Sequence, residues 1–207
     1  MEYEVRFYYP KKDLNNLKET INNINILKSN SRKYEKTVQY NHSNKEYDFY
    51  SKEIDGRFRL RITKDDKINK CKISWKKRLS NNGINKEEEI EITIKPEEYE
   101  NTIYILENVL HMRLIESYER YRTTFDNNEV EISIDEYPFG IALEIEAKKD
   151  YNNKANEIIN KYIKLLGLDI NKKYKLSWDD KYEELCKNQN IKQYNEVLFG
   201  KVMPEVK

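Results

Sequence analysis

The sequence contains few of the residues that build disulfide frameworks, zinc sites or flexible linkers. Its 207 residues include 2 cysteines, 2 histidines, 5 glycines and 4 prolines. The cysteines, Cys71 and Cys186, lie far apart and form neither a disulfide framework nor a CxxC site. A histidine-based zinc site is not expected from two histidines.

Further absences narrow the class of protein. No stretch approaches the roughly 18 apolar residues of a membrane span, and no signal-peptide pattern opens the chain, so we expect a soluble, cytoplasmic protein without a membrane partner. A GxxxxGK(S/T) loop is missing, which argues against a P-loop enzyme. The formal net charge of +1 argues against general nucleic-acid binding, because such binding requires a basic excess.

The residues that are abundant are charged or aromatic. Charged residues make up 36% of the chain and hydrophobic residues 38%, with 17 tyrosines to supply packing area, so the chain is not of the disordered type. We interpret Trp75 and Trp178 as packing aromatics rather than platforms for stacked bases. The length predicts a single domain over residues 1–190, followed by a C-terminal tail over residues 191–207.

Periodicity predicts an α+β fold in which an antiparallel sheet dominates. Strands with a period of two are expected at residues 2–8, 57–63, 71–78, 87–94, 118–125, 129–135 and 141–147, with weaker ones at 34–40 and 47–52. Helices are expected after Asp13, from Pro96, over residues 153–167, and from a capping box of Ser177 and Asp180.

The polar faces of the strands are sorted by the sign of their charge. Arg57, Arg59 and Arg61 share one face of one strand, whereas Glu144 and Glu146 share one face of another. Residues two apart lie about 6.5–7 Å from each other on the same face. A solvated face is the ordinary explanation of such alternation, but a solvated face usually mixes signs.

The two kinds of strand suit two ligands. A carboxylate-rich site without histidine or thiolate suits Mg²⁺ or Mn²⁺, which prefer oxygen ligands. Several arginines and lysines suit phosphate, because guanidinium binds its oxygens in a bidentate manner. A metal ion and a basic clamp together are common equipment for phosphoryl chemistry.

In these residues the chain resembles the CYTH family, the triphosphate tunnel metalloenzymes, to which class IV adenylyl cyclases and thiamine triphosphatases belong. Its ExExK signature is similar to Glu2-Tyr3-Glu4-Val5-Arg6, with arginine replacing lysine. Its closing stretch is similar to Asp135, Gly140 and Leu143-Glu144-Ile145-Glu146. The resemblance covers residues 2–186.

The resemblance implies an eight-stranded antiparallel barrel, a tunnel with a charged lumen and helices packed outside. It also implies roles for individual residues. The implied metal ligands are Glu2, Glu4, Glu144 and Glu146, and the implied triphosphate ligands are Arg6, Arg57, Arg59, Arg61, Lys76, Arg120 and Arg122. Glu89, Glu91 and Asp135 are the candidates for orienting a water or a second ion. Homodimers are common in the family.

The function expected from the resemblance is that of a metal-dependent triphosphatase. Its substrate would be tripolyphosphate, a nucleoside triphosphate such as ATP, or thiamine triphosphate; nucleic acid is expected only as a 5′-triphosphate RNA end. Hydrolysis is favoured because water is always available, whereas no nucleoside pocket is evident in the sequence. The alternatives are a class IV-type adenylyl cyclase, a non-catalytic triphosphate-binding module, and a structural domain without a site.

Overall fold

The computed structural model describes residues 2–50, 54, 56–66, 69–81 and 85–207, with the backbone alone at residues 2, 78, 80, 81 and 85–87. Within these residues the strands are β1 (Glu2–Tyr9), β2 (Lys28–Ser29), β3 (Lys33–His42), β4 (Gly56–Lys64), β5 (Asn69–Asn81), β6 (Asn85–Ile94), β7 (Met112–Asp126), β8 (Val130–Tyr137), β9 (Gly140–Ala147) and β10 (Glu196–Val197). The α-helices are α1 (Leu14–Asn22), α2 (Tyr99–Tyr104), α3 (Ala155–Leu165) and α4 (Trp178–Gln189).

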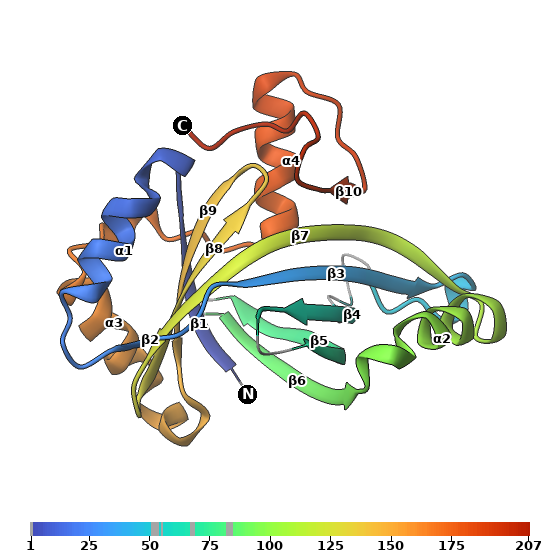
Figure 1. Ribbon diagram of the computed structural model, residues 1–207, viewed down its shortest axis with the longest axis horizontal. Coiled ribbons are helices and arrows are strands. Elements are labelled where there is room, and N and C mark those ends of the chain that lie inside the picture. Colours follow the sequence, from blue (N-terminus) through green and yellow to red (C-terminus); the bar gives the residue numbers. More distant parts are fainter. Residues whose placement is uncertain (1, 51–53, 55, 67–68, 82–84) are drawn as a thin grey trace.

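All of these strands belong to one curved sheet (Figure 1). The long strand β7 pairs with β3 over residues 112–122 and with β8 over residues 121–126. Pairing therefore runs from β7 through β3, β4, β5, β6, β1, β9 and β8, and returns to β7. These pairs are antiparallel, whereas β10 lies parallel to β7. The contact between β1 and β6 is short and joins residues 2–4 to residues 85–87.

The alternation along the strands places polar residues inside this curved sheet and apolar residues outside it. On β4, Arg59 faces inward, whereas Leu60 is buried in an apolar cluster with Val38 of β3. Successive side chains of a strand point to opposite faces. The charged residues that alternate along each strand in the sequence therefore lie on the inner surface of the folded sheet.

Helices cover the apolar outer face in two places (Figure 1). Helices α1 and α3 pack against β1, β8 and β9 through a cluster that includes Leu17, Ile21, Ile159 and Tyr162. Helix α2 and the π-helical turn after it (Ile105–Val109) cover β3, β4 and β5 through Leu106 and Ile103. This apolar packing on the outer face fixes the positions of the strands, and the other face of the same strands forms the inner surface.

Helix α4 and the C-terminal segment instead pack against inward-facing side chains of the sheet, namely Tyr118, Tyr137 and Ala142. Tyr182 and Leu185 of α4 pack in a cluster with Tyr118 of β7. Residues 191–207 are not separate from this cluster, because Val197 and Met203 are buried in it. Helix α4 begins with the predicted capping box of Ser177 and Asp180, and its first turn reaches the inner surface of the sheet.

The fold expected from the sequence is confirmed as an α+β antiparallel sheet of tunnel type, with two corrections. The sheet has ten strands rather than eight, because β2 and β10 add two residues each along β7 and are too short to show a period.

The strand predicted over residues 47–52 is wrong. Lys45–Tyr47 instead form a 3₁₀ turn, which is capped by the side chain of Asn44. Polar side chains of this kind bind backbone N–H groups that would otherwise form the hydrogen bonds of a β-sheet. Residues 51 and 52 lie outside the described residues.

The predicted helices are confirmed with shifts at their ends. Asp13 precedes α1 but makes no side-chain capping bond. Helix α3 is followed by Gly167 at φ +63°, a left-handed conformation that glycine adopts without strain. Among the described residues, none of the helices combines the length and apolar character needed to cross a bilayer.

Candidate functional site

Two of the three arginines on β4 are held by polar residues of β3. Arg59 Nε donates to Gln39 Oε1 at 3.2 Å, and Arg61 Nε donates to Thr37 Oγ1 at 3.0 Å. Each donor and its acceptor occupy directly opposed positions of the two strands. The bonds to neutral acceptors orient the guanidinium groups, and Arg61 Nη1 also lies 3.8 Å from Glu35 Oε2.

A second pair of arginines on β7 surrounds a buried carboxylate. Asp135 Oδ2 accepts from Arg120 Nη1 at 2.6 Å, and Asp135 Oδ1 accepts from Arg122 Nε at 2.6 Å. Glu35 on the other side accepts from Arg120 Nε at 2.7 Å. Burial alone would raise the pKa of Glu35, but Arg120 and Arg61 lower it well below its usual range. Glu35 therefore remains an anion.

Three carboxylates and one arginine line the wall formed by β1 and β9. Glu4 lies opposite Glu146, and Arg6 lies opposite Glu144. Arg6 Nε donates to Glu144 Oε1 at 2.6 Å, and Arg122 Nη2 donates to Glu144 Oε2 at 2.5 Å. Although burial opposes ionisation, Arg6 and Arg122 lower the pKa of Glu144 well below its usual range. Glu144 thus bridges the basic groups of two walls.

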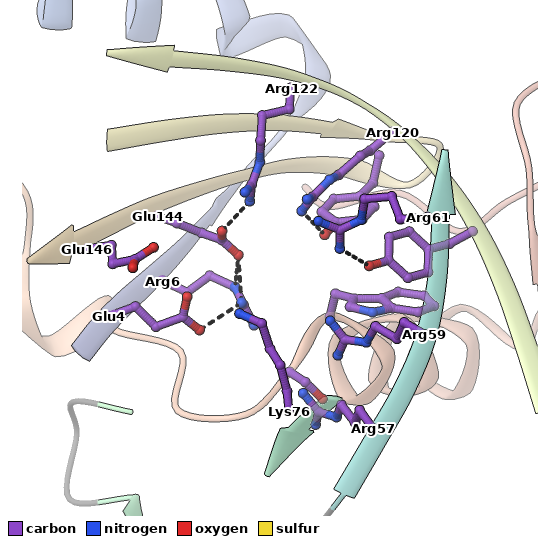
Figure 2. A pocket seen from close by; sticks show the side chains of 14 residues that line it. Glu4, Arg6, Arg57, Arg59, Arg61, Lys76, Arg120, Arg122, Glu144 and Glu146 are labelled. Atoms are coloured by element: carbon purple, nitrogen blue, oxygen red, sulfur yellow. Dashed lines mark hydrogen bonds and ion pairs between the residues drawn. The ribbon is translucent and has the colours of Figure 1, made fainter. Parts of the chain in front are cut away.

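These walls enclose a cavity of about 60 Å³ inside the sheet. Figure 2 shows the arginines of β4 and β7 on one side and Glu4, Glu144 and Glu146 on the other. The lining comprises Glu4, Arg6, Arg57, Arg59, Arg61, Lys76, Tyr118, Arg120, Arg122, Tyr137, Glu144, Glu146, Ser177 and Trp178. Basic side chains outnumber acidic ones in the lining, and the buried carboxylates of Glu35 and Asp135 behind it offset part of this excess.

A wider opening of about 570 Å³ adjoins the cavity and shares Arg61, Lys76, Arg122 and Glu146 with it. Lysines and glutamates also line it, among them Lys70, Lys72, Lys148, Lys149, Glu89 and Glu91. The enclosed part is small compared with ligand pockets of roughly 300–1,000 Å³. A triphosphate would therefore occupy the cavity together with this opening.

The structure brings most of the sequence-predicted site residues together. All seven predicted triphosphate ligands and three of the predicted metal ligands, Glu4, Glu144 and Glu146, line the cavity. Glu89 and Glu91 lie at the wider opening. Asp135 is 0% exposed and lies behind Arg120 and Arg122, outside the lining. The side chain of Glu2 lies outside the described residues.

The carboxylate wall has the donor chemistry for a hard divalent cation. Glu4, Glu144 and Glu146 offer oxygen ligands from two adjacent strands. Among the described residues, no group of three or more His, Cys, Asp or Glu side chains is already gathered for a metal ion. Glu4 and Glu144 instead contact Arg6. The donors suit such an ion, which would compete with arginine for them.

Several residues of the site were missed by sequence reasoning. Glu35, Thr37 and Gln39 hold the arginines from β3, and their alternation with Val38 and Tyr40 was a signal for an inward polar face. Tyr118 and Tyr137 lie two residues from Arg120 and Asp135 on their strands, so the two-residue period was a signal for their inward face. No sequence signal placed Trp178 in the lining, because its position depends on how α4 packs against the sheet.

Tyr118 occupies an unusual electrostatic environment within the lining. Its hydroxyl accepts a hydrogen bond from Arg61 Nη2 at 3.2 Å. Burial alone would raise the pKa of Tyr118, but Arg61, Arg59 and Arg120 lower it below its ordinary value because cations favour the phenolate. Burial raises the pKa of the neighbouring Tyr137. Tyr118 is therefore the member of this pair that ionises first.

We expect tyrosinate absorbance to develop in the native protein at a lower pH than in the unfolded chain, where tyrosine ionises near pH 10. The reason is that the pKa of Tyr118 is lowered in the folded protein. A spectrophotometric pH titration of the native and urea-unfolded protein measures it, and Tyr118→Phe should remove the early step. An early step that persists in this variant would assign the ionisation to another residue.

Comparisons with known proteins identify the fold. Neither a protein-family model nor a curated protein sequence matches the chain. Solved structures do match. The PH1012 protein of Pyrococcus horikoshii is 18% identical with a TM-score of 0.69, and the match covers 87% of this chain and 98% of that one. A candidate adenylate cyclase of Vibrio parahaemolyticus is 15% identical with a TM-score of 0.64, covering 86% and 96%.

A further structural neighbour is the candidate adenylyl cyclase HpAC1 of Hippeastrum, described as having a dominant triphosphatase activity. It is 15% identical with a TM-score of 0.60, and the match covers 93% of this chain and 98% of that one. At such identities the likeness shows the fold alone. This fold is consistent with the CYTH, or triphosphate tunnel, resemblance drawn from the charged strands.

Proposed function

We propose that the protein is a metal-dependent hydrolase of a small molecule that carries a triphosphate group. The observation that carries the proposal is the buried cavity in which seven basic side chains face three carboxylates. Guanidinium groups on several walls match an anion with oxygens in several directions. The descriptions of the structural neighbours name triphosphatase and cyclase activities, which agree with such a ligand.

In this proposal the walls of the cavity have different roles. Arg59 and Arg61, oriented by β3, hold phosphate oxygens from one side, while Arg120 and Arg122 hold them from another. Burial of these groups strengthens their attraction for the anion because little solvent screens it. Preorganised cations of this kind fix the triphosphate in line for attack and stabilise charge on the leaving phosphate.

The carboxylate wall would hold the cation. Glu4, Glu144 and Glu146 would bind Mg²⁺ or Mn²⁺, which when bound neutralises phosphate charge and orients water. Because Glu144 also accepts hydrogen bonds from Arg6 and Arg122, the carboxylate that would hold the cation also positions these two arginines. Glu89 and Glu91, at the wider opening, remain candidates for positioning water.

Cyclisation of ATP is a second candidate, and the neighbours described as adenylate cyclases favour it. Cyclisation requires the triphosphate to be bound in the same way, but its nucleophile is a ribose oxygen. Both reactions use the same phosphate site, so the identity of the products distinguishes them.

We expect orthophosphate to be released from at least one triphosphate in the presence of Mg²⁺ or Mn²⁺, and not in the presence of EDTA. The panel comprises tripolyphosphate, ATP, GTP, thiamine triphosphate and triphosphate-ended RNA, with products separated by ion-exchange chromatography. The variant Arg59→Met serves as the control for contaminating phosphatases. Cyclic AMP and pyrophosphate without orthophosphate would establish the cyclase instead. Tight binding without turnover would establish a binding module.

A further inference from the structure

Trp178 combines a packing role with a position in the cavity. It is the first residue of α4 and is 4% exposed. Its ring centroid lies 4.3 Å from that of Tyr118 and 6.0 Å from that of Tyr137. The same residue lines the cavity that Arg57 and Arg59 also line. Aromatic packing therefore fixes the indole at one end of the anion site.

The indole N–H of Trp178 is a buried donor without an acceptor. Nε1 has no hydrogen-bond partner among the residues that the structure describes. Arginine side chains in the same lining offer donors alone. The acceptors beside it in the chain have other partners: Ser177 Oγ accepts from the backbone N–H of Asp180 in the capping box, and Asp179 Oδ2 accepts from Tyr50 at 2.7 Å. Buried polar groups in folded proteins are normally paired, so this donor requires an explanation.

We propose that Trp178 is a substrate-binding residue whose indole N–H donates to a non-bridging oxygen of the phosphate group that lies against Arg57 and Arg59. The inference rests on the proposed function and adds a neutral donor to its basic clamp. Because the indole is packed and 4% exposed, it leaves little ring surface for a stacked base. The end of the substrate against α4 is thus a phosphate, and any organic group lies towards the wider opening.

Trp178→Phe tests the proposal because it preserves an aromatic ring and removes the N–H. We expect the Kd for inorganic tripolyphosphate, measured by titration calorimetry in EDTA, to rise about tenfold to a hundredfold, as for loss of a hydrogen bond to a charged group. Trp75→Phe is the matched control. Trp75 packs against Phe49 with ring centroids 5.4 Å apart and is not in the cavity lining. The Kd of Trp75→Phe for tripolyphosphate should therefore equal that of the unmutated protein.

The same two variants provide an independent optical measurement. The chain has 2 tryptophans, so Trp75→Phe leaves Trp178 as the sole indole and Trp178→Phe leaves Trp75. Tripolyphosphate should change the emission of the variant that retains Trp178 and leave the emission of the other unchanged. Thermal unfolding of both variants verifies that they are folded, and the emission experiment decides if Trp178→Phe does not fold.

The outcomes separate this inference from the proposed function. If the unmutated chain binds neither tripolyphosphate nor a nucleoside triphosphate, the proposed function fails and the role of Trp178 fails with it. If the unmutated chain binds tripolyphosphate but Trp178→Phe binds it equally tightly, the phosphate site stands and the inference about Trp178 is overturned. An unchanged emission of Trp178 on saturation with tripolyphosphate would overturn it as well.

Discussion

Asp135→Ala is expected to lower the free energy of unfolding by about 3–5 kcal/mol, the loss typical of removing one partner of a buried ion pair. Asp135 is 0% exposed and accepts hydrogen bonds from both Arg120 and Arg122. Without it, two adjacent guanidinium groups would face each other with less negative charge between them. Urea unfolding followed by circular dichroism measures the change.

Asp126→Ala is the matched control for this prediction. Asp126 pairs with Lys148 at 2.6 Å, but both side chains are about one-third exposed, at 30% and 35%. Exposed pairs contribute about 0–1 kcal/mol, so this variant should unfold close to the unmutated protein. Equal losses in the two variants would contradict the view that Asp135 balances the buried arginines.

This result would also define the role of Asp135 in the site. Sequence reasoning made it a candidate for orienting water, whereas the structure places it behind the cavity lining. From there it would act on the proposed substrate only by holding Arg120 and Arg122. We therefore regard Asp135 as a positioning residue, whose loss should affect stability and turnover together.

Glu144→Gln is expected to reduce metal-dependent phosphate release about a hundredfold or more. In the proposed site this carboxylate ligates the cation, and in the structure it accepts hydrogen bonds from both Arg6 and Arg122. Loss of one preorganised electrostatic group in an active site typically lowers the rate about 10²- to 10³-fold. Phosphate release from the preferred substrate of the panel, at saturating Mg²⁺ or Mn²⁺, measures the effect.

Binding in EDTA should respond in the opposite direction. Glu144 competes with phosphate for Arg6 and Arg122, so its neutralisation should leave the affinity for metal-free tripolyphosphate unchanged or increase it. Glu136→Gln is the control, because Glu136 binds Arg32 outside the cavity and should alter neither quantity. Weaker metal-free binding of Glu144→Gln would indicate that Glu144 has a structural role in the phosphate site.

Much of the fold followed from local pattern. The alternation over residues 57–63 predicted β4, because a strand that is apolar on one face and polar on the other repeats every two residues. The capping box of Ser177 and Asp180 predicted the start of α4 for a similarly local reason. Short or irregular elements such as β10 and the 3₁₀ turn at residues 45–47 escaped prediction, since tertiary contacts and side-chain bonds determine them.

The sequence by itself determined which side chains could share a face. Its two-residue period placed Arg59 with Arg61 and Glu144 with Glu146, and the sorting of charge predicted a surface for cations and anions. Only the tertiary structure decided which of these faces meet. It placed Glu144 between Arg6 and Arg122, withdrew Asp135 behind the lining, and brought Trp178 to the end of the cavity. The physical reason is that strand pairing across the sheet and the packing of α4 join residues far apart in the chain, and no local period records such contacts.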